Sequence, residues 1–143
     1  MVPEKSLYRP ILMDFRQENY DLFEEFPPVQ SPNNSKKIDL VFKDRDKNHL
    51  IAIEVKMSDW KRALKQALLN TTYCHYSYIA MPKRTVAILN KEIFKESGIG
   101  VIAVHEDNCK VVVKPKFSRS TPMVKKCSYT FDLMHKKRTL PKR

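Results

Sequence analysis

The chain of 143 residues has very little glycine, only two residues, and it has no long apolar run. No stretch approaches the roughly 18 consecutive apolar residues that a membrane-spanning helix needs. The first ten residues, MVPEKSLYRP, lack the apolar core of a secretory signal peptide. We therefore expect an intracellular, cytoplasmic protein without a membrane partner.

Cysteine and histidine patterns that bind zinc are also missing. The three cysteines, Cys74, Cys109 and Cys127, lie far apart and form no CxxC pair. The four histidines are scattered, and none stands at metal-ligand spacing from a cysteine or another histidine. These absences argue against a zinc site or a disulfide framework, and they favour free thiols in a reducing compartment.

Acidic residues are scarce in the last quarter of the chain. From Lys110 to Arg143, eleven lysines and arginines stand against one acid, Asp132, so this segment carries +10 of the total charge of +11. Residues 1–109 are nearly neutral, at +1. This asymmetry suggests a polyanionic partner, most simply a nucleic acid, and a solvated basic tail is the alternative explanation.

What is present is a hydrophobic fraction of 42% and a charged fraction of 30%, typical of one folded domain. Apolar periodicity predicts helix 6–20, strands 21–26, 38–42 and 50–56, helix 59–73, strand 76–81, helix 84–98, and strands 99–107 and 109–115. Residues 127–134 fit either a strand or a short helix. The expected fold class is α/β, a mixed central sheet flanked by helices, with a domain at 1–116 and a basic extension at 117–143.

Two helix ends carry recognisable signals. Ser58 or Asp59 is a suitable N-cap for helix 59–73, because short polar side chains accept hydrogen bonds from the first N–H groups of a helix. Gly98 is expected to close helix 84–98, because glycine adopts the left-handed conformation without a steric penalty.

Charged residues inside apolar strands form the most informative pattern. Asp39 is the one acid within the apolar segment 38–42, and Glu54 and Lys56 are the charges within and at the end of segment 50–56. A polar turn joins the two segments and predicts a hairpin in which Asp39 lies beside Glu54. Side chains two residues apart share a face and lie roughly 6.5 to 7 Å apart, so Lys56 is near the pair.

Two neighbouring carboxylates are hard oxygen ligands that suit Mg²⁺ or Mn²⁺. A lysine beside a metal-bound water can orient it, or help to deprotonate it when the pKa of the lysine is lowered. In the structural alternative, Glu54 and Lys56 form a weak ion pair on a solvated strand face, and Asp39 caps the preceding loop.

The arrangement of Asp39, fourteen residues and then Glu54-Val55-Lys56 resembles the motif of the PD-(D/E)xK nuclease superfamily, which has a restriction-endonuclease-like fold. The expected order of elements over residues 4–105 also matches the αβββαβ core of that superfamily. The segment DWKRALKQALLNTTY, followed by YIAMP, looks like a branch of small archaeal and bacterial nuclease-like proteins.

The resemblance implies metal-dependent hydrolysis of phosphodiester bonds, in DNA more often than in RNA. Asp39, Glu54 and the carbonyl of Val55 would hold Mg²⁺ or Mn²⁺. Lys56 would position the attacking water and stabilise the charge that develops on the phosphate. Many members of the superfamily act as homodimers, so the resemblance is also compatible with a homodimer.

Two further positions fit the resemblance. Glu4 opens the first predicted helix, where many members carry a glutamate that reaches the metal or its water. Gln66 lies on the helix after Lys56, where some branches place a glutamine or lysine that faces the site. Otherwise Glu4 is a helix N-terminal carboxylate and Gln66 an exposed helix residue. Ile38 replaces the proline that names the motif.

Basic side chains are the candidates for contacts with nucleic-acid phosphates. They are Lys36, Lys37, Lys61, Lys136, Lys137 and Arg138. The favoured function is a Mg²⁺-dependent deoxyribonuclease, most simply an endonuclease. The alternative is a nucleic-acid-binding protein that keeps the nuclease fold without catalysis, and a weaker third interpretation is a protein–protein module in a defence or repair complex.

Overall fold

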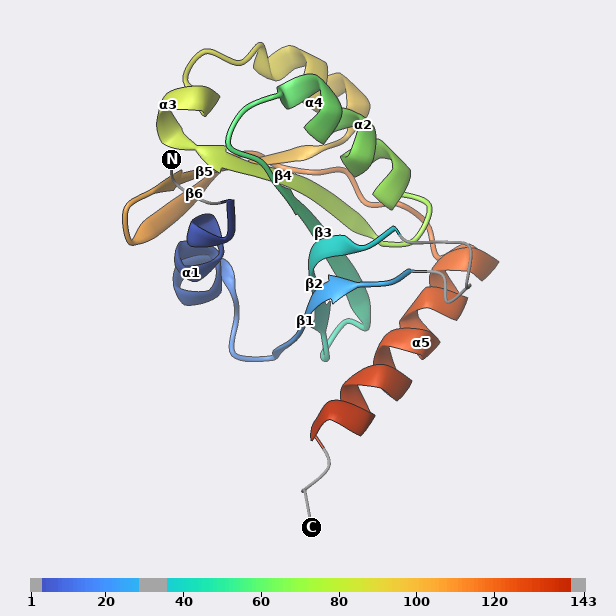
Figure 1. Ribbon diagram of the computed structural model, residues 1–143. Helices are drawn as coiled ribbons and strands as arrows, with labels where there is room; N and C mark the ends of the chain where they lie inside the picture. The colour runs from blue at the N-terminus through green and yellow to red at the C-terminus, as the bar shows by residue number, and fades with distance from the viewer. Residues whose placement is uncertain (1–3, 29–35, 140–143) are drawn as a thin grey trace.

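The computed structural model describes residues 4–28 and 36–139, without the side chains of Arg138 and Thr139. Within these residues one sheet forms the centre of the molecule, with its strands in chain order (Figure 1). The strands are β1 (Tyr20–Phe26), β2 (Ile38–Asp44), β3 (His49–Val55), β4 (Tyr76–Pro82), β5 (Gly100–His105) and β6 (Asn108–Val113). The helical elements are η1 (Glu4–Leu7), α1 (Tyr8–Pro10), η2 (Ile11–Phe15), α2 (Trp60–Asn70), α3 (Lys83–Val86), α4 (Lys91–Ser97) and α5 (Pro122–Thr139).

The sheet is mixed, as the sequence predicts. Strands β1, β2 and β3 form an antiparallel meander, whereas β4 and β5 run parallel to β3 and β6 returns antiparallel to β5. Parallel neighbours cannot be joined by a tight turn, and α2 accordingly makes the crossover from β3 to β4. Helices α3 and α4 make the next crossover, from β4 to β5. The structure therefore confirms an α/β fold with a mixed central sheet flanked by helices.

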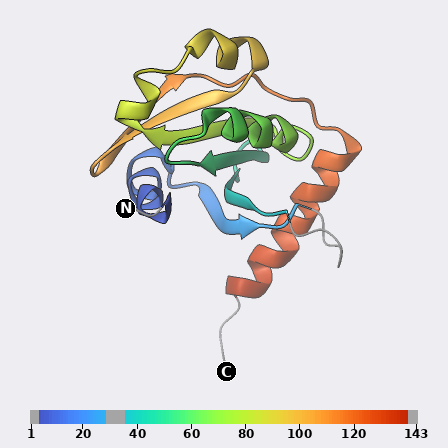
Figure 2. The ribbon, with the colours of Figure 1, turned by 45° about the horizontal axis from the view of Figure 1, so that its top comes forward.

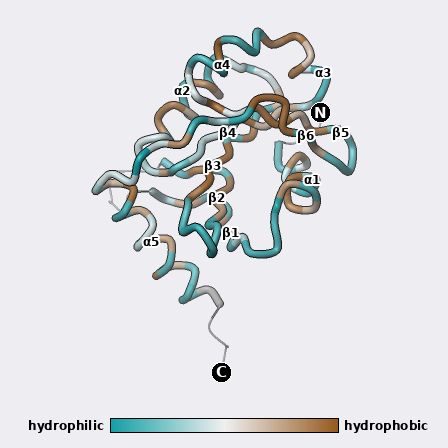
Figure 3. Tube along the Cα trace, turned by 180° about the vertical axis from the view of Figure 1, so that it is seen from behind, coloured by the Kyte–Doolittle hydropathy of each residue, from teal (hydrophilic) through white to brown (hydrophobic). Residues whose placement is uncertain are grey.

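Helices cover the sheet on both faces. The N-terminal segment η1–α1–η2 packs on the apolar side chains of one face, among them Phe42 and Ile53. Helices α2, α3 and α4 lie on the opposite side of β4 and β5 (Figure 1). Figure 2 shows α5 at the other end of the molecule from the N-terminal segment. Figure 3 shows brown, hydrophobic stretches in β2 and β3.

Two helix predictions need correction. The predicted helix 84–98 is two helices, α3 and α4, because the side chain of Asn90 accepts a hydrogen bond from the N–H of Glu92 at 3.1 Å and starts a new helix there. The predicted helix 6–20 ends at Phe15 and passes through 3-10, α and π turns. Pro10 explains the irregularity, since proline has no N–H for the regular helical hydrogen bond.

Both predicted caps are found. The side chain of Asp59 accepts a hydrogen bond from the N–H of Arg62 at 3.3 Å and caps α2. Gly98 adopts the left-handed conformation, with φ of 76°, at the end of α4.

Residues 127–134 form a helix and belong to α5. Cys127 and Phe131 are fully buried in a cluster with Phe23 and Phe26, so the apolar side of α5 extends the core beside β1. The ammonium group of Lys43 donates to both carboxylate oxygens of Asp132 at 2.7 Å. This part of the predicted basic extension is therefore held against the sheet. Across residues 4–28 and 36–139, no helix has the length and apolar character of a membrane span.

Gly100 occupies a position where the sheet leaves no room for a side chain. A Cβ atom there would lie 2.5 Å from the ring of Tyr78, the residue that pairs with Gly100 across β4 and β5. The absence of a side chain at this point thus lets an aromatic ring lie across the strand.

We expect Gly100→Ala to lower the free energy of unfolding by about 1 to 3 kcal/mol, because the added methyl group overpacks the contact with Tyr78. Urea denaturation measures the change. The double variant Gly100→Ala, Tyr78→Ala serves as the control and should lose less stability than the sum of the two single variants. Strict additivity would contradict the steric explanation.

Candidate active site

The hairpin of β2 and β3 sets Asp39 beside Glu54. Leu40 pairs with Ile53, so the next position along the two strands brings Asp39 opposite Glu54. The backbone N–H of Val55 donates a hydrogen bond to Oδ2 of Asp39 at 2.8 Å. Strand pairing and a backbone donor therefore orient the Asp39 carboxylate toward the neighbouring strand.

Glu54 is almost completely buried, with 3% of its surface exposed. The side-chain amide of Asn70, at the end of α2, donates to Oε1 of Glu54 at 2.9 Å. The ammonium group of Lys36 lies 3.9 Å from the same oxygen. A strand, a helix and the residues before β2 thus converge on one carboxylate.

The pKa of Glu54 is raised from its usual 4.5 to about 7, and burial is the largest cause. The negative charge of Asp39 and a hydrogen bond between the two carboxyl groups contribute to this rise. Asn70 and Lys36 oppose these effects because they stabilise the charged form. Such a carboxyl group titrates near neutral pH, where a nearby cation would favour its ionised form.

Tyr8 of α1 is a residue of the N-terminal segment that interacts with Asp39. Burial raises the pKa of the Tyr8 hydroxyl above its usual value, and the negative charge of Asp39 and a hydrogen bond to it add to the shift. The hydroxyl therefore stays protonated and donates toward Asp39. Tyr8 was not predicted from the sequence, where it belongs to an ordinary helical segment. Glu4, which was predicted, lies exposed at the start of η1.

Two amide oxygens on α2 lack a hydrogen-bond partner although they are buried. They are Oε1 of Gln66 and Oδ1 of Asn70. Among the described residues, Nδ1 of His49 is the other buried side-chain atom without a hydrogen-bond partner. Gln66 and Asn70 are four residues apart, so they lie on one side of the helix, the side that contacts Glu54. A buried acceptor without a donor costs roughly 1 to 3 kcal/mol, which suggests that a further donor or cation belongs here.

Lys56 directly follows β3 and is half-buried. Its backbone N–H donates to the carbonyl of Ala80 at 3.0 Å and so continues the pairing of β3 with β4. Because the strand geometry persists, Lys56 shares the face of Glu54, as the sequence predicts.

The oxygen donors fit a hard divalent cation. The described residues hold no group of three or more histidine, cysteine, aspartate or glutamate side chains that could bind a metal. Mg²⁺, however, is usually bound through one or two carboxylates together with waters and substrate phosphates. The N–H of Val55 points toward β2, and the carbonyl of the same residue in an extended strand points to the same side. The predicted ligands, Asp39, Glu54 and the Val55 carbonyl, thus have the oxygen chemistry that such an ion requires.

The predicted phosphate-binding residues are spread over the molecule. Lys36 lies at the carboxylates, whereas Lys37 is exposed beside it. Lys61, in the first turn of α2, lies 5.7 Å from the ring centre of Trp60. The remaining three are Lys136 and Lys137, both exposed near the end of α5, and Arg138, whose side chain is outside the described part of the chain.

Comparison with known proteins supports the fold. No protein-family model matches the sequence, and no curated protein matches it. The solved structure of SPO1766, a protein of unknown function from Silicibacter pomeroyi, is similar with a TM-score of 0.72. The alignment covers 96% of this chain and 88% of that chain at 17% sequence identity. The two chains therefore share the α/β architecture over nearly their whole lengths.

We expect Glu54→Gln to remove part of the pH dependence of stability. The wild-type carboxyl group has a higher pKa in the folded state than in the unfolded chain, so its contribution is fully present below pH 4.5 and is lost as pH rises through about 7. Glutamine can still accept from Asn70 and donate to Asp39, but it carries no charge. At pH 8 the variant should be more stable by about 2 to 3 kcal/mol.

Thermal and urea denaturation in EDTA between pH 5 and pH 8 measure this difference, and the two proteins should converge at the acidic end. Glu96→Gln, a change at an exposed glutamate of α4, is the matched control and should follow the wild-type curve. Parallel curves for Glu54→Gln and wild type would mean that Glu54 ionises normally.

Proposed function

We propose that the protein is a metal-dependent deoxyribonuclease of the PD-(D/E)xK type, most simply an endonuclease that uses Mg²⁺ or Mn²⁺. The observation that carries the proposal is the pair formed by the buried Glu54 and the half-buried Asp39 on neighbouring strands. The pair is unfavourable for folding, because burial and the negative charge of Asp39 both disfavour the ionised form of Glu54. A divalent cation would offset this repulsion, and the oxygen donors around the pair suit such an ion.

Each residue around the pair has a role in this proposal. Asp39, Glu54 and the carbonyl of Val55 would hold the ion, which would polarise the phosphate and lower the pKa of a water. The hydrogen bond from the Val55 N–H orients Asp39, and Asn70 orients Glu54. Glu54 would hold the cation in its deprotonated form, since metal ligands must be deprotonated.

Lys56, on the same face as Glu54, positions the attacking water and interacts with the negatively charged phosphate. Lys36 is close enough to Glu54 to balance part of its charge. The exposed Lys37 extends this positive region beyond the carboxylates. A homodimer would bring two such sites to the two strands of a duplex.

The nuclease proposal predicts Mg²⁺- or Mn²⁺-dependent cutting of supercoiled, linear, branched or single-stranded DNA. Asp39→Ala and Glu54→Ala should each lower the rate by about 100-fold or more, because each removes a metal ligand. Lys56→Gln should lower the rate while leaving Mn²⁺ binding, measured by calorimetry, close to that of wild type. Gel assays with matched concentrations of folded protein measure the rates.

Glu96→Ala and Lys65→Gln, two changes at exposed helix residues, are the charge-matched controls and should retain activity. An RNA substrate in the same assay tests the choice of nucleic acid. The proposal fails when no substrate is cut, or when Asp39→Ala and Glu54→Ala cut as fast as wild type.

A non-catalytic nucleic-acid-binding protein is the second candidate. It is favoured by the position of the positive charge, since residues 110–143 carry most of it and lie outside the carboxylate pair. Deletion of residues 117–143 would not test it cleanly, because Cys127 and Phe131 are buried in the core and their loss would disturb the fold.

Lys136→Gln combined with Lys137→Gln is the sharper test, because both side chains are exposed. For the non-catalytic protein, DNA affinity should persist in EDTA and in Glu54→Ala, and the double variant should weaken binding and reduce the salt slope by about 1 to 2. Fluorescence anisotropy at several salt concentrations measures both quantities. An unchanged slope would exclude this part of α5 from the binding surface, and Lys65→Gln serves as the control.

A further inference from the structure

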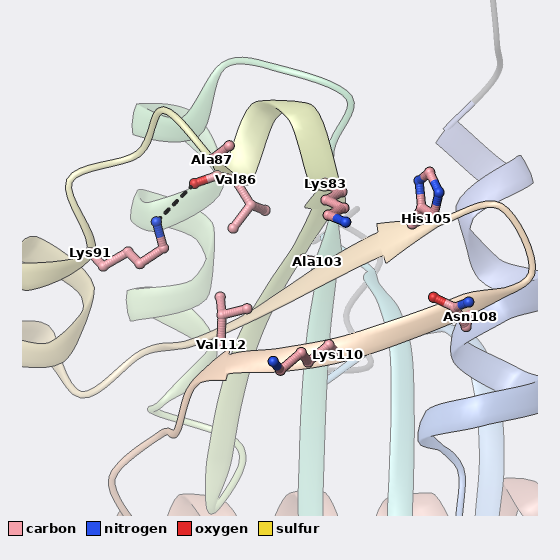
Figure 4. A pocket seen from close by; sticks show the side chains of 9 residues that line it. All are labelled: Lys83, Val86, Ala87, Lys91, Ala103, His105, Asn108, Lys110 and Val112. Atoms are coloured by element: carbon pink, nitrogen blue, oxygen red, sulfur yellow. Dashed lines mark hydrogen bonds between the residues drawn. The ribbon is translucent and has the colours of Figure 1, made fainter.

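A cavity lies over the half of the sheet away from the carboxylate pair, between α3, α4 and the hairpin of β5 and β6 (Figure 4). Its volume is about 350 Å³. Helix α2 packs over β3 and β4, whereas this cavity lies over β5 and β6. It is therefore separate from the Asp39–Glu54 pair, which belongs to β2 and β3.

The polar lining of the cavity is cationic. Lys83 comes from α3, Lys91 from α4 and Lys110 from β6, and none of the described lining residues is acidic. The ammonium group of Lys91 donates to the carbonyl of Val86 at 3.2 Å, which holds it at the wall and leaves two of its three N–H groups for another acceptor. Lys83 and Lys110 are exposed and form no ion pair within the described part of the chain.

The remaining lining is apolar. Val86 and Ala103 are 2% and 8% exposed, and Val112 is half-buried. Figure 4 shows the side chains of Val86 and Val112 pointing toward one another from opposite walls. His105 and Asn108 add polar groups at the end of the cavity nearest the turn of the hairpin. A ligand that matches this lining has an anionic end and a flat, largely apolar body.

We propose that this cavity binds one nucleotide unit, with the phosphate held by Lys83 and Lys110 and the base between Val86 and Val112. Its volume is at the low end of small-ligand pockets, about 300 to 1,000 Å³, so it suits a single nucleotide rather than a dinucleotide. Lysine ammonium groups bind phosphate as point charges, and apolar walls accept the face of a base. The unit comes from a free nucleotide or from the end of a nucleic-acid strand.

The test is a calorimetric and ¹⁵N-NMR titration of the full chain with AMP in EDTA. AMP should shift the amide resonances of residues 83–91 and 103–112, and adenosine and inorganic phosphate should each bind at least tenfold more weakly. Resonance shifts confined to other residues, no shifts at millimolar AMP, or inorganic phosphate binding as tightly as AMP would overturn the proposal. If single-stranded 5′-phosphorylated (dA)₄ displaces AMP and shifts the same resonances, the ligand is the end of a nucleic-acid strand. If AMP binds and (dA)₄ does not, the ligand is a free nucleotide.

Lys83→Gln combined with Lys110→Gln should lower the affinity for AMP at least tenfold. Lys65→Gln combined with Lys95→Gln removes the same charge from α2 and α4 outside the cavity and should leave the affinity unchanged. Equal affinities for the two double variants would show that charge in the cavity does not bind the phosphate. Asp39→Ala should bind AMP as wild type does. The nuclease proposal and the nucleotide-binding proposal can therefore fail independently, and the two failures are distinguishable.

Discussion

The register of the β2–β3 hairpin is the constraint on which the rest of this molecule depends. In the observed register Leu40 pairs with Ile53, and both are buried beneath the N-terminal helical segment. The same register sets Asp39 beside Glu54 on the other side of the strands. A slip by one residue would turn every side chain of one strand to the opposite face, which would bury charges in the core and separate the carboxylates. Core packing thus specifies the geometry of the candidate site.

The carboxylate pair opposes folding to a degree that its surroundings only partly offset. The Val55 N–H, the Asn70 amide and the Lys36 ammonium group stabilise the charges. Even so, burial and the negative charge of Asp39 raise the pKa of Glu54 to about 7, and nearby amide oxygens have no donor among residues 4–28 and 36–139. Ionisable groups that lower the stability of a fold are typical of functional sites. Replacing such groups by neutral, well-packed residues would stabilise the fold. A bound cation would satisfy the same groups at once.

Positive charge is distributed over several surfaces rather than collected at the carboxylates. Lys36 lies in the site, Lys83 and Lys110 line the cavity over β5 and β6, and α5 carries further lysines at the far end of the molecule. The buried face of α5 is held by Phe131 and by the ion pair with Lys43, so its basic residues are presented on a fixed scaffold. Long-range attraction of a polyanion would act on all these surfaces, whereas chemistry is expected only where oxygen ligands meet.

Local patterns in the sequence determined the strands, the hairpin, the crossover helix α2 and the Asp39, Glu54 and Lys56 set, because alternation and turn residues act over a few positions. The break between α3 and α4 was missed because helical periodicity continues across Asn90. Only the tertiary structure decided that Tyr8 and Asn70 interact with the carboxylates, that α5 joins the core, and that three lysines line one cavity over β5 and β6. These side chains come from segments far apart in the chain, and their meeting depends on how helices pack across the sheet, which a local pattern does not encode.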